Sequence, residues 1–365
     1  MSSGSVPVIG LIGGSGTVGR TAALRISAAG LGSLRIGGRN LDAAMDVAEE
    51  CVGPAETVRL NLTDGGDLEE FCSGCSVVVN CAGPSYLVLD SVAQAAFSVS
   101  ADYVDVGGDL PAADALRAAA IFPERTAIFS AGAMPGLSGL LPRLITAGRP
   151  LRRLETYVGG VARFTPLSAA DGLLTRGDRF GEAMASMQDA AIVSNSVAPL
   201  RDVQLPGFPM PVQAWPYLTT EAQSLGHLPG IAEVRAYNVF ASDRLTRVMT
   251  HAWAQLSDSP DHDELAPFIP SIVDATVADE DEFGSFYVML FTGRPARGYD
   301  RGITRVVLRA EDSYGLSGSM VALATERIVR GEVSSGVHLA AEAIDPIDAV
   351  HWLRADPLVH ELVVQ

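Results

Sequence analysis

The segment from Val6 to Gly19 constrains the fold of this chain more than any other part of the sequence. An apolar run at Val8–Ile12 leads into a glycine-rich turn, and apolar residues at helical spacing follow it. The turn consists of Gly13, Gly14, Ser15, Gly16, Thr17, Val18 and Gly19. Glycines at these spacings allow a tight turn, close approach of a pyrophosphate to the backbone, and packing of the helix against the strand. The segment therefore predicts a dinucleotide site at the positive end of the helix, and a tight turn that binds nothing is the alternative.

Strand and helix patterns alternate through the first 135 residues. Strands are expected at Val8–Ile12, Leu34–Gly37, Val58–Leu62, Val77–Asn80, Tyr103–Val106 and Ala127–Ser130. Helices are expected at Val18–Ala29, Leu41–Cys51, Val88–Phe97 and Ala112–Ala120. This alternation predicts an α/β fold with a doubly wound parallel sheet of the Rossmann type, which binds ligands at the carboxyl ends of its strands.

The pattern changes near Pro135. After a helix at Leu137–Ala147, the strand patterns are mostly not separated by single helices. They are expected at Leu154–Val161, Val234–Ala241, Ser285–Thr292 and Thr304–Ala310, before a helix at Leu316–Val329. The sequence therefore predicts a Rossmann domain at residues 1–135 and a second α+β domain, built on a mostly antiparallel sheet, at residues 136–335. The segment 336–365, with a helix at Asp348–Leu353, is expected to pack back on the first domain.

Three segments of the second domain lack a strand or helix pattern. Pro199–Pro216 is rich in proline and is interpreted as an ordered surface loop. Asp258–Asp263 and Asp279–Glu282 are interpreted as solvated acidic turns.

Composition excludes several classes of function. The formal net charge is −17 and no basic run is present, which argues against nucleic acid or an anionic membrane as a partner. All 26 basic residues are arginines, so a lysine Schiff base or a lysine acid is excluded. The sequence has neither a leader pattern nor 18 consecutive apolar residues, so a cytoplasmic location without a membrane span is expected. Four cysteines are too few for a disulfide scaffold. Cys72 and Cys75 have the C-x-x-C spacing of redox and zinc sites, but no second pair completes a tetrahedral site, so no metal is expected.

The residue after the second strand indicates the type of dinucleotide. NAD-specific sites place an acidic residue about 20 positions after the last glycine of the turn, where it holds the ribose hydroxyls. That position is Arg39 here, and a guanidinium can pair with a 2′-phosphate. The sequence therefore predicts NADP rather than NAD, and an ordinary exposed arginine is the alternative. Asn40, which follows, is also suited to cap the next helix.

The carboxyl ends of the next two strands are expected to supply further cofactor contacts. Asn61 and Leu62 follow the third strand, where adenine would lie. The fourth strand leads into a turn at the place expected for the nicotinamide ribose: Asn80, Cys81, Ala82, Gly83 and Pro84. Glycine and proline are equally common in any tight turn, which is the alternative interpretation.

Four motifs in this order resemble those of the saccharopine dehydrogenase family, and more closely its saccharopine reductase-like branch. They are Gly13–Gly19, Val77–Pro84, Asp102–Asp109 and Ala131–Ser138, and the later Gly336–His338 with Asp345 and Pro346 is also similar to that family. The resemblance is specific through about residue 140 and loose from there to residue 330. It implies a Rossmann domain followed by an α/β domain that forms the substrate cleft and a homodimer sheet. It also implies reduction or oxidation of a C–N bond between an amino acid and a carbonyl partner.

The resemblance implies roles for single residues. Gly13, Gly16 and Gly19 would hold the pyrophosphate and Arg39 the 2′-phosphate. Asn80, Ala82 and Gly83 would line the nicotinamide half, with Met134, Pro135 and Gly136 on its other side. Asp109 stands where the family commonly has glutamate, and the lysine acid of some relatives is absent. A biosynthetic enzyme that acts on another imine, rather than one with saccharopine as its substrate, is therefore expected.

Hydride transfer to an imine needs a held cofactor, a held substrate and a proton donor. Tyr86 and Asp109, each soon after a strand end, are the candidate catalytic donors. Their alternative roles are packing the turn and capping the next helix. Arg163 and Arg176 are candidates for binding a substrate carboxylate, and His338 is expected to have a structural role.

The sequence thus predicts an NADP-dependent oxidoreductase for a C=N bond of a small amino-acid-derived metabolite. Two alternatives remain open. One is an enoyl reductase, which acts on a C=C bond, and the other is a non-catalytic NADP-binding sensor or scaffold.

Overall fold

The computed structural model describes residues 6–62, 65–119, 124–146, 150–175, 177, 179–258, 260–299 and 302–365. The chain divides into two compact units. The first unit comprises Met1–Leu137 and Tyr314–Trp352, and the second comprises Ser138–Ser313 and Leu353–Gln365. The boundaries after residues 135 and 335 stay a prediction about which parts fold as domains.

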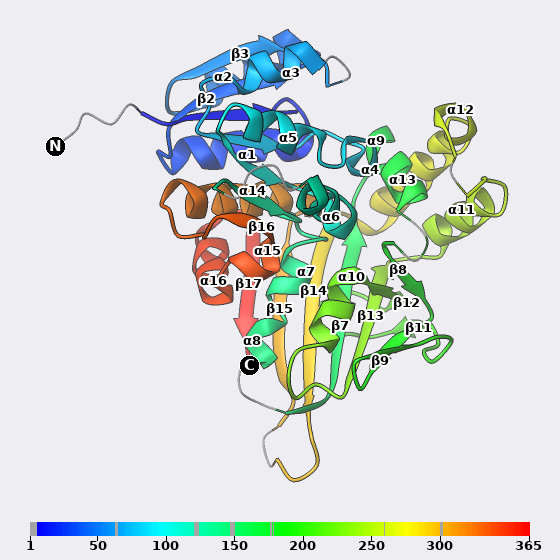
Figure 1. Cartoon of the computed structure of the whole chain (residues 1–365). Coiled ribbons are helices and arrows are strands. Elements are labelled where there is room, and N and C mark those ends of the chain that lie inside the picture. The colour runs from blue at the N-terminus through cyan, green and yellow to red at the C-terminus, as the bar shows by residue number, and fades with distance from the viewer. Residues whose placement is uncertain are drawn as a thin grey trace. The chain divides into compact units, whose positions relative to one another are not determined.

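The first unit is built on a seven-stranded sheet in the order β16-β6-β5-β4-β1-β2-β3, and every pair in it is parallel (Figure 1). Its strands are β1 (Val8–Ile12), β2 (Ser33–Gly38), β3 (Ala55–Arg59), β4 (Val77–Asn80), β5 (Asp102–Asp105), β6 (Thr126–Phe129) and β16 (Gly336–Leu339). The strand order reverses between β1 and β4, and such a switch point is where doubly wound sheets bind ligands. The prediction of a Rossmann-type sheet is confirmed.

Helices flank this sheet in the first unit (Figure 1). They are α1 (Thr17–Ala28), α2 (Leu41–Glu50), α3 (Gly65–Cys72), α4 (Ser85–Val88), α5 (Ser91–Ser98), α6 (Asp109–Ala119), α14 (Ser313–Val329), α15 (Ala340–Ala343) and α16 (Pro346–Ala355). Side chains of α3, α5 and α6 join one core with the strands, in which Phe71, Phe97 and Phe129 are buried. Burial of such apolar area is the main stabilising contribution to the unit.

Helix α14 was expected in the second domain, but all of it after Ser313 belongs to the first unit. The physical reason is its close packing on α1. A Cβ on Gly318 would lie 2.6 Å from the Cβ of Thr21 and 2.7 Å from the carbonyl oxygen of Val18. Only glycine lets the two helices approach so closely.

The second unit contains a ten-stranded sheet with the main order β10-β9-β13-β7-β14-β15-β17, and β12 pairs with β13, β11 and β8. Its strands are β7 (Leu151–Val161), β8 (Gly181–Ala183), β9 (Ser186–Gln188), β10 (Ala191–Val193), β11 (Leu200–Val203), β12 (Val212–Thr219), β13 (Glu233–Phe240), β14 (Phe286–Pro295), β15 (Thr304–Ala310) and β17 (Val359–Val364). Only β7 and β13 pair in parallel among the described strands of this sheet. The prediction of a mostly antiparallel second sheet is confirmed.

The helices of the second unit fall into two groups. Helices α9 (Pro166–Leu174), α11 (Arg244–Trp253), α12 (His262–Leu265) and α13 (Ile269–Phe283) share one apolar cluster and gather at one end of the sheet (Figure 1). The shorter helices are α7 (Leu137–Leu140), α8 (Arg143–Thr146) and α10 (Thr220–Gly226). The single helix expected at Leu137–Ala147 is thus two short turns as far as the structure describes it.

Two predicted loops contain regular structure. Pro199–Pro216 includes β11 and the start of β12, because Val212 and Ala214 are fully buried against the sheet. Asp279–Glu282 lies in α13 rather than in a solvated turn. Asp279 is only 6% exposed, because its carboxylate pairs with the Arg244 guanidinium at 2.7 Å.

Smaller differences concern helices that lack a strong apolar pattern. Asp258–Asp263 contains the start of α12, where Asp261 forms a capping box with Glu264. Helix α3 was not predicted. The described chain contains no helix long and apolar enough to span a membrane.

The C-terminal segment 336–365 is divided between the two sheets. Strand β16 pairs with β6 in the first unit, as expected for a segment that packs back on the first domain. Strand β17 instead pairs with β15 in the second unit. Its alternation of exposed and half-buried residues suits a sheet edge.

Candidate cofactor site

The glycine-rich turn joins β1 to α1 and is shaped by its own backbone. Gly13 has φ +74°, and its N–H donates to the Gly37 carbonyl at 2.8 Å. A Cβ on Gly19 would lie 2.2 Å from the Gly13 carbonyl oxygen. A Cβ on Gly14 would lie 2.6 Å from the Ile36 side chain. Glycine is therefore required at these positions by the turn and by the packing of α1.

Gly16 differs from the other glycines because nothing in the fold crowds it. It is exposed, its backbone is extended, and a Cβ there would meet only the Gly13 carbonyl oxygen, at 3.2 Å. Gly16 is the N-cap of α1, where no side chain caps the helix and no acidic residue occupies the first turn. The first N–H groups of a helix have no partner within it and attract an anion. This bare helix end fits the pyrophosphate of NADP.

Arg39 and Asn40 are exposed directly after β2. In the part of the chain that the structure describes, no carboxylate forms an ion pair with Arg39. Ser15 reaches this strand end, since a Cβ on Gly38 would lie 3.5 Å from the Ser15 hydroxyl oxygen. A guanidinium without an ion-pair partner among the described residues, at this strand end, fits a 2′-phosphate. Asn40 caps α2 by accepting from the Ala43 N–H at 3.2 Å, which confirms its expected capping role.

The turn after β4 lies against the glycine-rich turn. A Cβ on Gly13 would be 3.0 Å from the Ala82 nitrogen. Asn80 is 1% exposed, and its amide accepts from the Ala82 N–H at 3.1 Å and donates to the Ala82 carbonyl at 3.2 Å. The Asn80 side chain therefore holds the turn in place, and its contact with a cofactor stays a prediction.

A buried carboxylate supports this turn from the neighbouring strand. Asp105 is 2% exposed and lies opposite Asn80 in the sheet register. It accepts hydrogen bonds from the Asn80 amide at 3.0 Å, the Gly107 N–H at 2.8 Å and the Tyr103 hydroxyl. Burial raises the pKa of Tyr103 well above its usual value, and the adjacent Asp105 raises it further. The sequence analysis did not predict this network. An acidic residue at the carboxyl end of an apolar strand is the signal that could have indicated it.

The other residues predicted near this turn stay predictions as cofactor contacts. Burial, and then the charge of Asp105, raise the pKa of the Cys81 thiol. Asn61 and Leu62 follow β3, with Asn61 exposed and Leu62 half-buried. Tyr86 lies in α4, but its side chain is outside the described residues.

Asp109 begins α6 with φ +42°, and its carboxylate accepts from the Leu110 N–H at 2.8 Å. This contact is the structural role considered for it. The proton-donor role of Asp109 stays a prediction.

The loop after β6 is equally tight. Gly136 has φ +133°, and a Cβ there would lie 2.2 Å from the Gly132 carbonyl oxygen. The Ala133 N–H donates to the Ser317 hydroxyl of α14 at 3.0 Å, which fixes the loop within the first unit. The Met134 side chain is 42% exposed, whereas Pro135 is half-buried. These three residues, Met134, Pro135 and Gly136, are therefore held in place, and their contact with nicotinamide stays a prediction.

Several residues considered for substrate binding or redox chemistry have contacts or pKa shifts that suit other roles. Arg163 pairs with Glu280 at 2.9 Å, and Arg176 lies outside the described residues. His338 donates from Nε2 to the Ser334 carbonyl at 2.9 Å, which is a structural contact. Burial raises the pKa of the Cys72 thiol to about 12 and also raises that of Cys75, so both are poor nucleophiles. Within the described ranges, no cluster of three or more side chains is arranged to hold a metal.

The second unit holds a buried carboxylate that no sequence pattern indicated. Glu221 of α10 is 5% exposed and accepts a hydrogen bond from the Ser138 hydroxyl. Burial, and then the charge of Glu221, raise the pKa of Tyr287 on β14. The three residues come from elements far apart in the sequence, so only the fold brings them together.

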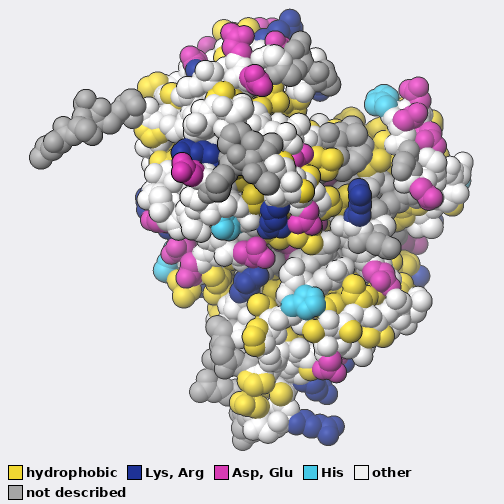
Figure 2. Space-filling view, viewed as in Figure 1, with side chains coloured by type: hydrophobic (Ala, Val, Ile, Leu, Met, Phe, Trp, Pro, Cys, Tyr) yellow, Lys and Arg dark blue, Asp and Glu magenta, His cyan; other side chains and the backbone are white. Residues whose placement is uncertain are grey.

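Charged side chains are dispersed over the surface drawn in Figure 2. Among the residues coloured there, arginines lie singly between acidic and apolar side chains, with no continuous basic patch on that face.

Comparison with known proteins assigns the amino-terminal part of the chain. Residues 9–128 match the family model of the saccharopine dehydrogenase NADP binding domain. The first unit therefore contains an NADP-binding domain of the type found in saccharopine dehydrogenase-like oxidoreductases. The resemblance read from the motifs and the prediction of NADP are confirmed. No curated protein matches the sequence.

Comparison with solved structures concerns the fold. Apo saccharopine dehydrogenase (L-Glu forming) from Saccharomyces cerevisiae aligns with a TM-score of 0.68 at 16% identity, over 98% of this chain and 100% of the yeast chain. The fold of the whole chain is thus that of saccharopine dehydrogenase. A myo-inositol dehydrogenase from Corynebacterium glutamicum gives a TM-score of 0.45 at 11% identity, over 91% of this chain and 90% of its own.

Proposed function

We propose that the chain is an NADP-dependent oxidoreductase that reduces, or forms by oxidation, a C=N bond of an amino-acid-derived metabolite. The observation that carries the proposal is the pair formed by the bare α1 terminus at Gly16 and the unpaired Arg39, both in the domain that matches the NADP-binding family model. The saccharopine dehydrogenase fold supports chemistry at a C–N bond, because the structurally similar yeast protein is a saccharopine dehydrogenase.

The residues have distinct tasks in this proposal. Gly13–Gly19 hold the pyrophosphate, and Arg39 with Ser15 holds the 2′-phosphate. Asn61 and Leu62 flank the adenine. When bound, NADPH supplies the hydride. The turn at Asn80–Pro84, held by Asp105, and the loop at Met134–Gly136 orient the nicotinamide half.

A proton must reach the substrate nitrogen during reduction. Tyr86 and Asp109, in the same unit as the NADP-binding turn, are the proposed donors. Asp109 reacts in this way only if its carboxyl is protonated, which burial by substrate would favour. The second unit selects the substrate, and the chain acts as a homodimer in the cytoplasm.

Cofactor titration tests the first part of the proposal. Nicotinamide fluorescence is followed while NADPH or NADH is added to the protein. We expect tight binding of NADPH and weak binding of NADH. Equal affinity would remove the assignment of Arg39, and binding of neither would remove the proposal.

Turnover tests the second part. NADPH oxidation is followed with mixtures of amino acids and carbonyl compounds that form imines, and separately with enoyl substrates. Imine-dependent oxidation supports the proposal. Oxidation with enoyl substrates alone would favour a C=C reductase. Tight NADPH binding without turnover on either panel would favour a sensor. Light scattering tests the homodimer, and a monomer at every concentration would exclude it.

A further inference from the structure

A buried carboxylate lies at the carboxyl end of β5, one strand away from the turn proposed to orient the nicotinamide half of the cofactor. Asp105 is 2% exposed and lies opposite Asn80 of β4 in the sheet register. Its oxygens accept hydrogen bonds from the Gly107 N–H at 2.8 Å, the Asn80 amide at 3.0 Å and the Tyr103 hydroxyl. A charge buried in this way acts on its surroundings through a low effective dielectric constant, so it does not need to touch the group that it influences.

The hydrogen bonds of Asp105 favour its charged form. The Gly107 N–H donates to Oδ1, and the Asn80 amide nitrogen donates to Oδ2. The orientation of the Asn80 amide is fixed, because its own oxygen accepts from the Ala82 N–H at 3.1 Å. Each oxygen of Asp105 therefore faces a group that can only donate, and such donors favour the carboxylate over the protonated carboxyl. These donors are neutral, so they hold the negative charge without cancelling it.

The strand order places this charge on the nicotinamide side of the cofactor site. The order is β5-β4-β1-β2-β3, with the glycine-rich turn after β1 and Arg39 after β2. The proposed 2′-phosphate and pyrophosphate contacts thus lie at β2 and β1. A dinucleotide bound across the carboxyl ends of the strands then has its other half over β4 and β5. Neighbouring strands are about 4.8 Å apart, so β5 lies about 10 Å from β1.

One side chain separates Asp105 from the backbone of the β4 turn. The Asn80 amide, which donates to Asp105, also donates to the Ala82 carbonyl at 3.2 Å. Ala82 packs against the glycine-rich turn, since a Cβ on Gly13 would lie 3.0 Å from the Ala82 nitrogen. The carboxylate is therefore close to the proposed place of the nicotinamide ribose. Burial also protects its charge from screening by salt.

The two redox states of the cofactor differ in charge at this end. NADP⁺ carries one positive charge on its nicotinamide ring and NADPH carries none, whereas both share the pyrophosphate and the 2′-phosphate. We propose that the negative charge of Asp105 stabilises bound NADP⁺ relative to bound NADPH. The chain then favours the direction in which NADPH is oxidised and the C=N bond is reduced. This inference rests on the proposed function, which supplies the cofactor and its orientation, and it adds the direction of the reaction.

The affinities of Asp105→Asn for the two cofactors test the proposal. NADPH binding is followed by nicotinamide fluorescence, and NADP⁺ binding by competition with NADPH. We expect NADP⁺ to be weakened about tenfold relative to NADPH, because only NADP⁺ loses the attraction of the charge. Damage to the turn would weaken both cofactors equally, so the ratio of the two Kd values separates charge from structure. An unchanged ratio would overturn the proposal.

Tyr103→Phe is the matched control. It removes one hydrogen bond from the same carboxylate and leaves the negative charge in place. The ratio of the two Kd values should therefore stay at the wild-type value, even if the variant is less stable. A shift as large as that of Asp105→Asn would mean that the shape of the network, rather than its charge, sets the ratio, and it would overturn the proposal.

Asp105→Ser is the second neutral variant, for use if Asp105→Asn does not fold. Its rotatable hydroxyl places no fixed donor against Gly107 or Asn80, and the same shift of the ratio is expected. Failure of the proposed function gives different results. If the wild type binds neither cofactor, the cofactor assignment and this inference both fail. If the ratio shifts in the neutral variants but no imine is turned over, the charge effect stands and only the C=N assignment fails.

Discussion

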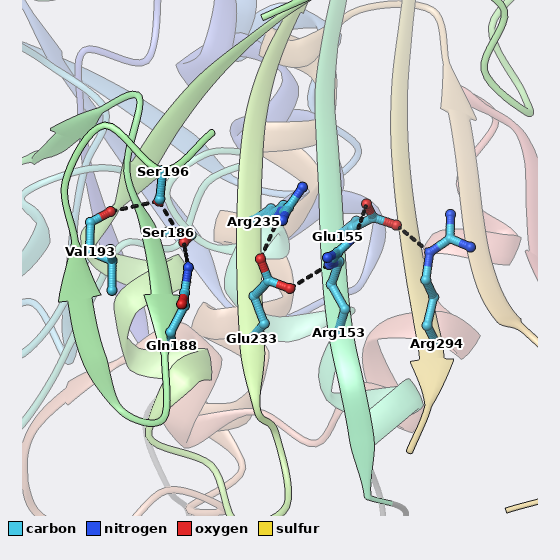
Figure 3. Close-up of polar contacts among 9 residues, drawn as sticks. All are labelled: Arg153, Glu155, Ser186, Gln188, Val193, Ser196, Glu233, Arg235 and Arg294. Atoms are coloured by element: carbon cyan, nitrogen blue, oxygen red, sulfur yellow. Dashed lines mark hydrogen bonds and ion pairs between the residues drawn. The ribbon is translucent and has the colours of Figure 1, made fainter. Parts of the chain in front are cut away.

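The turn at the edge of the first sheet and the row of charges on the face of the second sheet differ in the groups that form them. The glycine-rich turn, proposed to hold the pyrophosphate, is formed by backbone. Gly13, Gly14 and Gly19 leave room for their neighbours, and Gly16 leaves the helix end without a side-chain cap. On the face of the second sheet, a row of long side chains that alternate in charge crosses β13, β7 and β14 (Figure 3), and we call this row the charge ladder. It consists of Arg235, Glu233, Arg153, Glu155 and Arg294. A close approach of backbone at glycine leaves no room for any other residue type. In contrast, a charged side chain of an ion pair can be replaced while the strand remains. The stability of the first region should therefore fall when a side-chain atom is added at a glycine. The stability of the second region should fall when a charge is removed.

The largest effect is expected for Gly19→Ala. The new Cβ would lie 2.2 Å from the Gly13 carbonyl oxygen and 2.7 Å from the Gly14 Cα, and these backbone atoms cannot move aside without distorting the turn. We expect a loss of about 3 kcal/mol in the free energy of unfolding, measured by urea denaturation, and loss of NADPH binding.

Gly53→Ala is the matched control, since a Cβ there meets nothing within 4 Å. It should stay within about 0.5 kcal/mol of the wild type. If Gly19→Ala behaves like this control, the first region is not limited by backbone packing and the contrast with the ladder fails.

The second effect concerns the side-chain network that supports the first region. Asp105→Asn keeps the shape of the side chain but replaces one acceptor oxygen by an amide donor. That donor faces either the Gly107 N–H or the amide of Asn80 beside the Tyr103 hydroxyl. An unsatisfied buried donor costs about 2 kcal/mol, so the free energy of unfolding should fall by that amount. Asp114→Asn, in an exposed pair with Arg117, should change it by less than about 0.5 kcal/mol. Equal stability of the two variants would show that the β4 turn does not depend on Asp105.

The third effect tests the role of a charged side chain, rather than that of the backbone, within the NADP-binding domain. Arg39→Ala should weaken NADPH about tenfold, which corresponds to about 1.4 kcal/mol, and leave NADH unchanged, because only NADPH carries the 2′-phosphate. Arg117→Ala serves as the control, since Arg117 pairs with Asp114 on α6. If Arg39→Ala weakens the binding of both cofactors equally, the guanidinium contacts the pyrophosphate or supports the fold instead.

The contrast between the two regions also explains what could be read from the sequence. Contiguous residues encode the first region: a strand, a glycine-rich turn and a helix follow one another, and Arg39 is found by counting from Gly19. The Rossmann-type sheet and the NADP-binding domain were predicted for that reason. The mostly antiparallel second sheet was predicted from strand patterns that are not separated by single helices. Asp105 was missed because its partners, Asn80 and Tyr103, become visible only when β4 and β5 are placed in register.

The second region is encoded by residues far apart in the chain. The charge ladder joins Arg153 to Glu233, 80 residues apart, and Glu155 to Arg294, 139 residues apart. Strand register alone brings these side chains together. Strand β12 was hidden by Pro209, Pro211 and Pro216, although Val212 and Ala214 alternate as buried residues of a strand. The contact of helix α14 with α1 through Gly318 has no sequence signal, because the two helices are far apart in the chain.

The smallest effect belongs to the ladder and depends on pH. Burial raises the pKa of Glu233, but the hydrogen bonds and charges of Arg153 and Arg235 outweigh it, so the pKa lies below its usual value of 4.5. A lowered pKa in the folded state stabilises the protein above the unfolded value, and this contribution is lost as pH falls through the folded value. Glu233→Gln should therefore lower the free energy of unfolding by about 1 kcal/mol at pH 7. The difference from the wild type should close below about pH 4.5, where the wild-type carboxyl takes up its proton. Asp274→Asn, an exposed residue of α13, should show no such difference at either pH. If the difference in the free energy of unfolding between Glu233→Gln and the wild type persists at low pH, Glu233 stabilises the sheet by the shape of its side chain rather than by its charge. The ladder would then resemble the glycine turn.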